Sequence, residues 1–216
     1  MLEIGAGQGA VGARLAERFE YVGVEADATS AAVAQSRVEA AGGTLLSGDL
    51  YEVDIDGVFD IVCAFEVLEH IEDDRAALKD WGTRLTDSGR LLLSVPAHQH
   101  RYGAWDAAAG HYRRYGREEL SRLLRECGFT DVQVFAYGFP LSYLLEAARD
   151  RIAARRARSH ATPEAATATS GRQLQPPAFL GAATWVVTAP FRYAQRPFAS
   201  TGLGTGLVAT AVASRP

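Results

Sequence analysis

Three glycines near the start of the chain are spaced as in turns that bind nucleotides. The segment LEIGAGQGA places Gly5, Gly7 and Gly9 between an apolar run and a helix-like run. Because glycine has no Cβ atom, a ligand could reach the backbone amide groups there. The pattern Gly5-x-Gly7-x-x-Ala10 also fits the dinucleotide fingerprint, with Glu25 twenty residues after Gly5, where an acid would bind ribose hydroxyls. The turn predicts a nucleotide-like ligand without identifying it, and the glycines could also serve only a tight turn.

A dense group of polar and aromatic side chains occurs later, in residues 98–115. Its members are His98, His100, Arg101, Tyr102, Trp105, Asp106, His111, Tyr112, Arg113, Arg114 and Tyr115. Guanidinium groups hold carboxylates or phosphates by paired hydrogen bonds, so the group could bind an anionic ligand. The same residues could instead cap the next helix and pair with surface acids. The candidate substrate-binding residues are His98, Tyr102, Trp105, Asp106, Arg113 and Arg114.

Short apolar runs alternate with longer amphipathic segments and predict the elements that position these residues. Strands are expected at 1–4, 21–24, 44–46, 58–65 and 91–95, and helices at 10–19, 28–41, 74–85 and 117–127. Turn-forming residues at 86–89 are expected to end the third helix. The alternation predicts a parallel sheet with helices on both faces. Two later alternating runs, 129–137 and 204–214, predict an antiparallel pair at the sheet edge.

Composition indicates one folded domain over residues 1–216, because 48% of the residues are hydrophobic and 22% are charged. Residues 138–203 are expected to form a helical, partly flexible insertion, with a basic helix at 141–158, a Thr/Ala/Ser/Pro-rich stretch at 159–177 and an apolar segment at 178–198. This insertion could be a lid over the crevice, or could equally be structural padding. It could also rest on a membrane surface or admit a lipid-like acceptor, and we favour membrane contact less.

Charge and cysteine content narrow the partners and the compartment. The net charge of -4 makes nucleic acid an unfavoured partner, so a small molecule is expected. Cys63 and Cys127 are expected to be free thiols. The chain starts without a signal-peptide pattern and has no apolar run of about 20 residues, so a cytoplasmic location is expected.

Five segments together resemble the class I S-adenosylmethionine-dependent methyltransferases. Glu3, the glycine turn and Glu25 after VGV look like the first two motifs of that family, and Gly48-Asp49-Leu50 follows the third strand as its adenine-binding segment does. FDIVCAFEVLEHIEDD at 59–74 is similar to the fourth motif, and LTDSGRLLLSVPAH at 85–98 to the fifth strand with its preceding turn. The resemblance implies a Rossmann-like α/β fold, S-adenosylmethionine as cofactor, and methyl transfer to a small molecule, with a hydroxyl oxygen as the expected acceptor atom.

The resemblance also implies roles for individual residues. Glu25 would accept hydrogen bonds from both ribose hydroxyls, and Asp49 from the adenine amino group, although Asp49 could be only a turn residue. A carboxylate at Glu3 would repel a pyrophosphate but suits a ligand that carries a sulfonium and an ammonium. The candidate cofactor-binding residues are Glu3, Gly5, Ala6, Gly7, Gly9, Glu25, Ala26, Asp49, Leu50, Phe65 and Glu66.

A hydroxyl acceptor must lose a proton during methyl transfer, so a base is expected after the fourth or fifth strand. His70 lies in a Glu-x-x-Glu-His pattern that recurs in the small-molecule methyltransferases it resembles, and His111 lies in GHYRRY, which resembles a bacterial subgroup. His70 and His111 are the candidate catalytic residues, although either could only brace a helix. No metal is expected, because His98 with Asp106 or His111 matches no compact ligand spacing.

The chain departs from the family pattern at its beginning. Family members usually carry one or two helices before the first strand, whereas Met1 falls inside the first expected strand, so a truncated chain is expected. Two other functions stay open. An NAD-dependent oxidoreductase could use the same turn, although no Tyr-x-x-x-Lys pair or second nucleotide-binding half is visible, and a non-catalytic S-adenosylmethionine-binding module would need no base.

Overall fold

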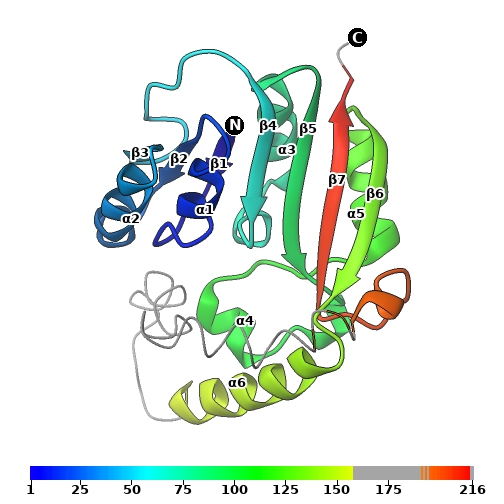
Figure 1. Ribbon diagram of the computed structural model, residues 1–216. Helices are drawn as coiled ribbons and strands as arrows, with labels where there is room; N and C mark the ends of the chain where they lie inside the picture. The colour runs from blue at the N-terminus through cyan, green and yellow to red at the C-terminus, as the bar shows by residue number, and fades with distance from the viewer. Residues whose placement is uncertain (158–190, 192, 194, 215–216) are drawn as a thin grey trace.

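A seven-stranded sheet forms the centre of the computed structural model, which describes residues 1–157, 191, 193 and 195–214. The strands lie in the order β3-β2-β1-β4-β5-β7-β6 (Figure 1). Their bounds are β1 (Leu2–Ile4), β2 (Val22–Glu25), β3 (Thr44–Ser47), β4 (Phe59–Phe65), β5 (Leu85–Pro96), β6 (Phe129–Tyr137) and β7 (Gly206–Ala213). β1 to β5 pair in parallel, while β7 pairs antiparallel with both β5 and β6. The predicted parallel sheet with an antiparallel final pair is confirmed.

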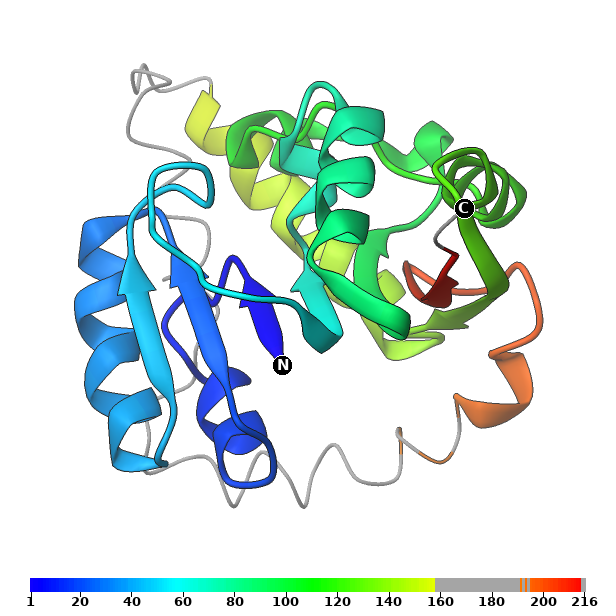
Figure 2. The same cartoon turned by 90° about the horizontal axis from the view of Figure 1, so that it is seen from above.

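Helices cover both faces of this sheet, and further helices lie below the ends of its central strands in Figure 1. Their bounds are α1 (Gly12–Ala16), α2 (Ala28–Ala40), α3 (Asp74–Thr83), α4 (Ala104–Ala109), α5 (Arg117–Glu126) and α6 (Leu141–Ala157), with short 3-10 helices η1 (Leu68–His70), η2 (Gln99–Arg101) and η5 (Arg196–Phe198). α1 and α2 lie on one face and α3 and α5 on the other, and α4 and α6 lie beyond the ends of β4 and β5 (Figures 1 and 2).

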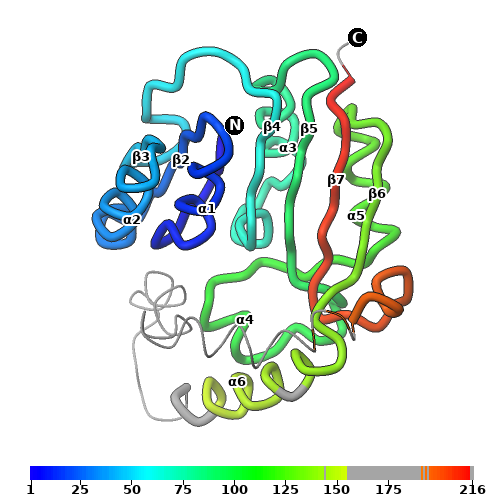
Figure 3. The backbone as a smooth tube through the Cα atoms, in the orientation of Figure 1, coloured from blue at the N-terminus to red at the C-terminus, as the bar shows by residue number. Residues whose placement is uncertain are grey.

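The chain moves outward from β1 in one direction through β2 and β3, then returns to the centre and moves the other way through β4 and β5. Right-handed crossovers in opposite directions place their helices on opposite faces. In open α/β sheets, ligands bind outside the carboxyl ends of the strands at such a reversal. Here the reversal lies between β1 and β4, and Figure 3 shows the turn after β1 and the end of β4 at the same edge.

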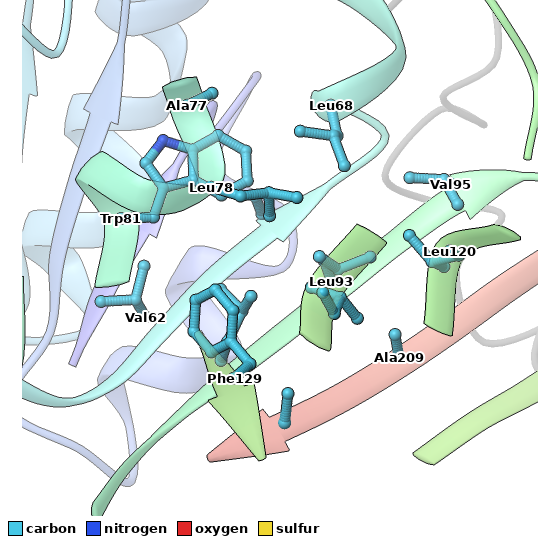
Figure 4. Packing of buried hydrophobic residues seen from close by; sticks show 14 of the residues in the cluster. Val62, Leu68, Ala77, Leu78, Trp81, Leu93, Val95, Leu120, Phe129 and Ala209 are labelled. Atoms are coloured by element: carbon cyan, nitrogen blue, oxygen red, sulfur yellow. The ribbon is translucent and has the colours of Figure 1, made fainter. Parts of the chain in front are cut away.

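The main hydrophobic core lies between the sheet and the helices α3 and α5. Trp81, Leu78 and Leu93 are fully buried there, with Phe129 beside them (Figure 4). Leu68 of η1 is fully buried in the same cluster. The segment that follows β4 is therefore anchored by the core, and the side chains next to Leu68 are held in place with it.

Two sequence-based boundaries were wrong. The helix expected at 10–19 is the shorter α1, with turns at 10–11 and 17–18 on either side. Gly9, before these turns, has a φ of 75° and approaches α2 closely, since a Cβ atom there would lie 2.9 Å from Cα of Ala34. The turn residues 86–89 do not end a helix, since α3 ends at Thr83 and β5 already begins at Leu85. They form an irregularity within the strand, where the register with β4 shifts and Ser88 has a φ of 64°.

The insertion is described only in part. The helix expected at 141–158 is confirmed as α6, whereas the stretch 159–177 and most of the apolar segment 178–198 lie outside the described residues. Among the described helices, none has the length and apolar character that crossing a membrane would require. Cys63 and Cys127 are free thiols, as expected.

Candidate active site

The three glycines after β1 each serve a different purpose in the turn. All three have positive φ angles, 72° at Gly5, 56° at Gly7 and 75° at Gly9. A Cβ atom at Gly5 would lie 2.5 Å from Cγ2 of Val67, so this residue lets the segment after β4 approach. Gly9 allows close contact with α2, as described above. A Cβ atom at Gly7 would meet nothing within 4 Å, so the open space of the turn lies at Gly7.

The carboxylate of Glu25, at the end of β2, lies directly beside this turn. Its Oε2 accepts a hydrogen bond from the backbone N–H of Gly7 at 2.7 Å, and its Oε1 accepts one from the N–H of Asp27 at 2.9 Å. Burial raises the pKa of Glu25, and these two hydrogen bonds lower it in part. The predicted ribose-binding acid and the predicted glycine turn are thus in contact, although they are 18 residues apart in the chain.

Glu3 is enclosed under the turn. Its side chain is buried, and it accepts a hydrogen bond from the hydroxyl of Tyr21. A Cβ atom at Gly12 would lie 3.0 Å from Oε2 of Glu3, so the absence of a side chain at Gly12 makes room for this pair. Burial raises the pKa of Glu3 to about 7, against the lowering effect of the Tyr21 hydrogen bond. Glu3 therefore links β1 to the residue before β2.

The remaining predicted cofactor residues lie along the same strand ends. Asp49, after β3, is exposed and its Oδ1 accepts a hydrogen bond from the N–H of Tyr51 at 2.9 Å. Ala26 is exposed, while Ala6 and Leu50 are buried. An exposed carboxylate next to an apolar side chain is the pairing that would contact the edge and the face of a base.

Phe65 and Glu66 end β4. Phe65 is half-buried, and Glu66 is exposed with a φ of 56°. Oε1 of Glu66 accepts hydrogen bonds from the hydroxyl of Ser94 at 2.7 Å and from that of Tyr137 at 3.0 Å. Burial and the Glu66 carboxylate raise the pKa of Tyr137, so its hydroxyl keeps its proton. The Glu66 side chain therefore joins the end of β4 to Ser94 of β5 and to Tyr137 of β6.

His70 and His111, the two candidate catalytic residues, are in contact. Their ring centroids are 4.6 Å apart and the rings are perpendicular. Burial, with a contribution from His111, lowers the pKa of His70 to about 4, so this imidazole is neutral near pH 7. Glu69 lies with them: its carboxylate is fully buried, and its Oε1 is 4.0 Å from Nε2 of His111. Burial and the neighbouring Glu66 raise the pKa of Glu69 well above its ordinary value.

Asp106 and Arg114, predicted to bind substrate, form a buried ion pair. Oδ1 of Asp106 is 2.8 Å from Nε of Arg114 and 2.8 Å from Nδ1 of His111, and Nη1 of Arg114 is 3.0 Å from Oε1 of Glu146 in α6. Burial opposes ionisation of Asp106, but hydrogen bonds from His111, Arg114 and the N–H of Gly103 lower its pKa to about 2. The guanidinium of Arg114 is therefore already held by two carboxylates.

The other predicted substrate residues surround this pair. His98 follows β5 with a φ of 66°, and the hydroxyl of Tyr102 donates to the carbonyl of His111 at 2.6 Å. The N–H of Trp105 donates to Asp150 of α6 at 3.1 Å. Arg113 pairs with Asp74 at 2.7 Å. The polar residues at 98–115 thus lie against α6, and their charged side chains form ion pairs within the chain.

Five residues of this region were not among those predicted: Tyr21, Glu69, Ser94, Tyr137 and Glu146. Only Glu69 had a sequence signal, since it is the second acid of the Glu-x-x-Glu-His pattern. The others come from segments whose contact with the site depends on the tertiary fold. A separate open pocket is lined by Arg117, Glu118, Ser121, Arg122, Arg125 and Val134, which include none of the predicted site residues.

Comparison with known proteins assigns a family to this arrangement. A family model described as a methyltransferase domain matches residues 1–134. An uncharacterized methyltransferase of Mycobacterium tuberculosis is 35% identical over 108 residues, which are 49% of this chain and 55% of that protein. A probable S-adenosylmethionine-dependent methyltransferase of the same organism is 30% identical over 135 residues, 61% of this chain and 49% of that protein.

Solved structures agree on the fold. Phosphoethanolamine N-methyltransferase 2 of Haemonchus contortus, in complex with S-adenosyl-L-methionine, is similar with a TM-score of 0.61 at 18% identity, over 100% of this chain and 48% of that one. At this identity the likeness concerns the fold alone. The chain spans about half the length of the curated relatives it matches. On the family model, which covers more than half of its residues, the chain belongs to the class I S-adenosylmethionine-dependent methyltransferases, and its cofactor is S-adenosylmethionine.

Proposed function

We propose that this chain transfers the methyl group of S-adenosylmethionine to a hydroxyl oxygen of a small molecule. The observation that carries the cofactor part is the hydrogen bond from the N–H of Gly7 to the carboxylate of Glu25, at the edge where the strand order reverses. An adenosyl group at this turn would place its ribose hydroxyls on Glu25 and its adenine near Asp49.

The acceptor part is supported by two imidazole groups, His70 after β4 and His111 after α4. In methyl transfer, the sulfur–carbon bond breaks as the oxygen–carbon bond forms, and the hydroxyl proton must leave. His70 is neutral near pH 7 because burial lowers its pKa, and His111 lies in ring contact with it. A neutral imidazole can accept a hydrogen bond from a hydroxyl group, which an imidazolium cannot.

The chemical class of the acceptor follows from its surroundings. Arg113 already pairs with Asp74, and Arg114 pairs with Asp106 and Glu146. Their positive charges are therefore largely balanced within the chain and attract an anionic acceptor less strongly. We therefore favour a neutral hydroxyl compound over an anionic one. The free thiols Cys63 and Cys127 support a reducing compartment, for which we propose the cytoplasm.

Calorimetry with S-adenosylhomocysteine and with NAD tests the cofactor site. Glu25→Ala and Asp49→Ala should each weaken S-adenosylhomocysteine binding by about 1–3 kcal/mol. Glu52→Ala, which removes an exposed acid from the same loop as Asp49, is the matched control and should bind as the parent chain does. Unchanged affinity in both site variants, or tighter binding of NAD than of S-adenosylhomocysteine, would refute the assignment and favour the oxidoreductase alternative.

A labelled methyl donor tests whether the chain is an enzyme. Incubation with cell extract and with a panel of alcohols, phenols and amines should label a hydroxyl compound of low molecular mass. His70→Gln should bind S-adenosylhomocysteine normally but transfer methyl groups more slowly. Binding of the cofactor with no labelled product in any fraction would favour the non-catalytic binding module.

A further inference from the structure

Glu69 is a fully buried acid beside the two candidate catalytic histidines. The residue is fully buried, and neither carboxylate oxygen has a hydrogen-bond partner among the residues that the structure describes. An ionised carboxylate in such surroundings costs several kcal/mol unless it is paired or binds a metal. Asp106, equally buried in the same region, accepts hydrogen bonds from His111, Arg114 and the N–H of Gly103. The contrast sets Glu69 apart from the structural acids of the site.

Two imidazole groups lie beside this carboxylate with nitrogen atoms available. One ligand atom each from Glu69, His70 and His111 can be chosen so that all lie within 4.8 Å of one another. Nδ1 of His70 is buried and has no hydrogen-bond partner in the described part of the chain. One carboxylate and two imidazoles form the ligand set of many open zinc sites and of non-haem iron sites.

The orientation of His111 is fixed as in a metal site. Oδ1 of Asp106, which also accepts a hydrogen bond from Nε of Arg114, lies 2.8 Å from Nδ1 of His111. A carboxylate oxygen accepts hydrogen bonds, so Nδ1–H of His111 is the donor, and Nε2 is the nitrogen that faces the cluster, 4.0 Å from Oε1 of Glu69. Histidine ligands of metals commonly donate their other ring N–H to a carboxylate, which fixes the tautomer.

We propose that Glu69, His70 and His111 bind a divalent transition-metal ion of the Zn²⁺ type, with Asp106 supporting His111. Bonds of about 2.0–2.2 Å from a tetrahedral Zn²⁺ place its ligand atoms about 3.4 Å apart. The present spacing, which reaches 4.8 Å, must therefore contract by as much as about 1.4 Å. Side-chain rotation can provide this, because Leu68 and Asp106 anchor the segments while the ligand side chains turn. Three protein ligands leave a fourth position open.

This site would complete the proposed reaction. Val67, next to η1, packs against Gly5 of the cofactor turn, so the ion would lie near the bound methyl donor. A hydroxyl group of the acceptor at the open position would bind next to a cation, which favours transfer of its proton to solvent water. His70 and His111 would then act by holding the ion, in place of accepting the proton themselves. In this last step the inference rests on the proposed function, whereas ion binding itself does not. It replaces the expectation of no metal, which considered His98 with Asp106 or His111 and not Glu69 with His70.

The test measures ion binding without any methyl donor. The full chain, freed of its affinity tag and of metal by a chelator that is then removed by dialysis, is titrated with Co²⁺ while visible absorption is recorded, and Zn²⁺ is added in competition. We expect one Co²⁺ per chain, with the ligand-field bands of a low-coordinate site that Zn²⁺ abolishes. Glu69→Gln and His111→Gln should each weaken binding at least about 100-fold, and Asp106→Asn about 10- to 100-fold.

His100→Ala is the matched control, because it removes an exposed histidine outside the cluster. It should bind Co²⁺ as the parent chain does, and circular dichroism should show that each variant is folded. No saturable binding, or binding that survives in folded Glu69→Gln, would overturn the inference and indicate a protonated, neutral Glu69. S-adenosylhomocysteine affinity, measured on the same metal-free chain, reports on the proposed function separately, so that failure of one does not imply failure of the other.

Discussion

Replacing Glu3 by glutamine should stabilise the fold above neutral pH. Burial raises the pKa of this carboxyl to about 7 from an ordinary value of 4.5. The native state therefore keeps the proton up to about pH 7, while the unfolded chain releases it near pH 4.5. Each unit of pKa difference corresponds to about 1.4 kcal/mol. Ionisation of Glu3 should thus cost the native state up to about 3 kcal/mol by pH 8.

The sign of the pH dependence follows from the raised pKa. Below pH 4.5 the carboxyl is protonated in both states and contributes no pH dependence. Between pH 4.5 and about 7 the native state binds more protons than the unfolded state, so stability falls as pH rises. Glutamine cannot ionise, and its amide oxygen can accept the hydrogen bond from Tyr21. The variant should therefore match the parent chain near pH 4.5 and exceed its stability by about 2–3 kcal/mol at pH 8.

Urea unfolding followed by circular dichroism at intervals from low to high pH measures this difference. The pH profile of the difference isolates Glu3, because the other carboxylates titrate in both proteins. Tyr21→Phe is the companion variant: it removes the hydrogen bond that lowers the pKa of Glu3, so its stability should keep falling to a higher pH than that of the parent chain. A stability difference between Glu3→Gln and the parent that stays constant over this range would refute the reasoning.

Three further changes have matched controls in the chain. Gly7→Ala and Gly42→Ala both place a Cβ atom in open space at a positive φ, so each should lose about 1–2 kcal/mol of stability. Only Gly7→Ala should also weaken S-adenosylhomocysteine binding in calorimetry, and equal affinities would argue against a ligand above the turn. Arg114→Ala should lose about 3–5 kcal/mol in urea unfolding, because it removes the buried guanidinium that joins two buried carboxylates, whereas Arg113→Ala should lose less than about 1 kcal/mol. Equal losses would show that burial of the Arg114 network matters little. His98→Gly should be about 1 kcal/mol more stable than His98→Ala, because only glycine relaxes at a φ of 66°. Equal melting temperatures would contradict the strain at this position.

The order of the elements could be predicted because it depends on local periodicity. Alternation of short apolar runs with amphipathic helices specifies a parallel sheet, and the glycine turn marks the end of its first strand. The start of β5 could not be predicted, because residues 86–89 have the composition of a turn. In the sheet they form a bulge, where Phe59 pairs with Leu85 and Ile61 with Arg90. The turn-forming residues correctly indicated an irregular backbone at 86–89. They did not mark the end of an element, because the strand continues through them and pairs with β4 and β7.

The candidate site divides in the same way. Residues within one motif, such as Gly7 with its turn, were predicted from spacing alone. The partners of Arg114 were not, since Glu146 lies 32 residues further along the chain in a helix whose position depends on the whole fold. An arginine-rich loop reads as an anion-binding site when its own acids are unknown. Whether such a loop binds substrate or only α6 depends on contacts that no local pattern records.

Backbone strain shows how the carboxyl edge of the sheet is built. In the described part of the chain, the residues other than glycine with positive φ are Glu66, Ser88, His98 and Asp131. Ser88 and Asp131 lie at register shifts in β5 and β6, which explain their conformation. Glu66 and His98 lie at no such shift. Glu66 directly follows the last pairing of β4, and His98 follows the bridge between Ala97 and Tyr115. Their N–H groups donate to the carbonyls of Ser94 and Tyr115 at 2.9 Å. A strained residue persists only where its surroundings over-determine it, at a cost of about 1–3 kcal/mol. The two strand ends that lead into η1 and η2 are therefore held against local preference, and this directs the following residues, among them Glu69 and His70, into the edge where the cofactor turn lies.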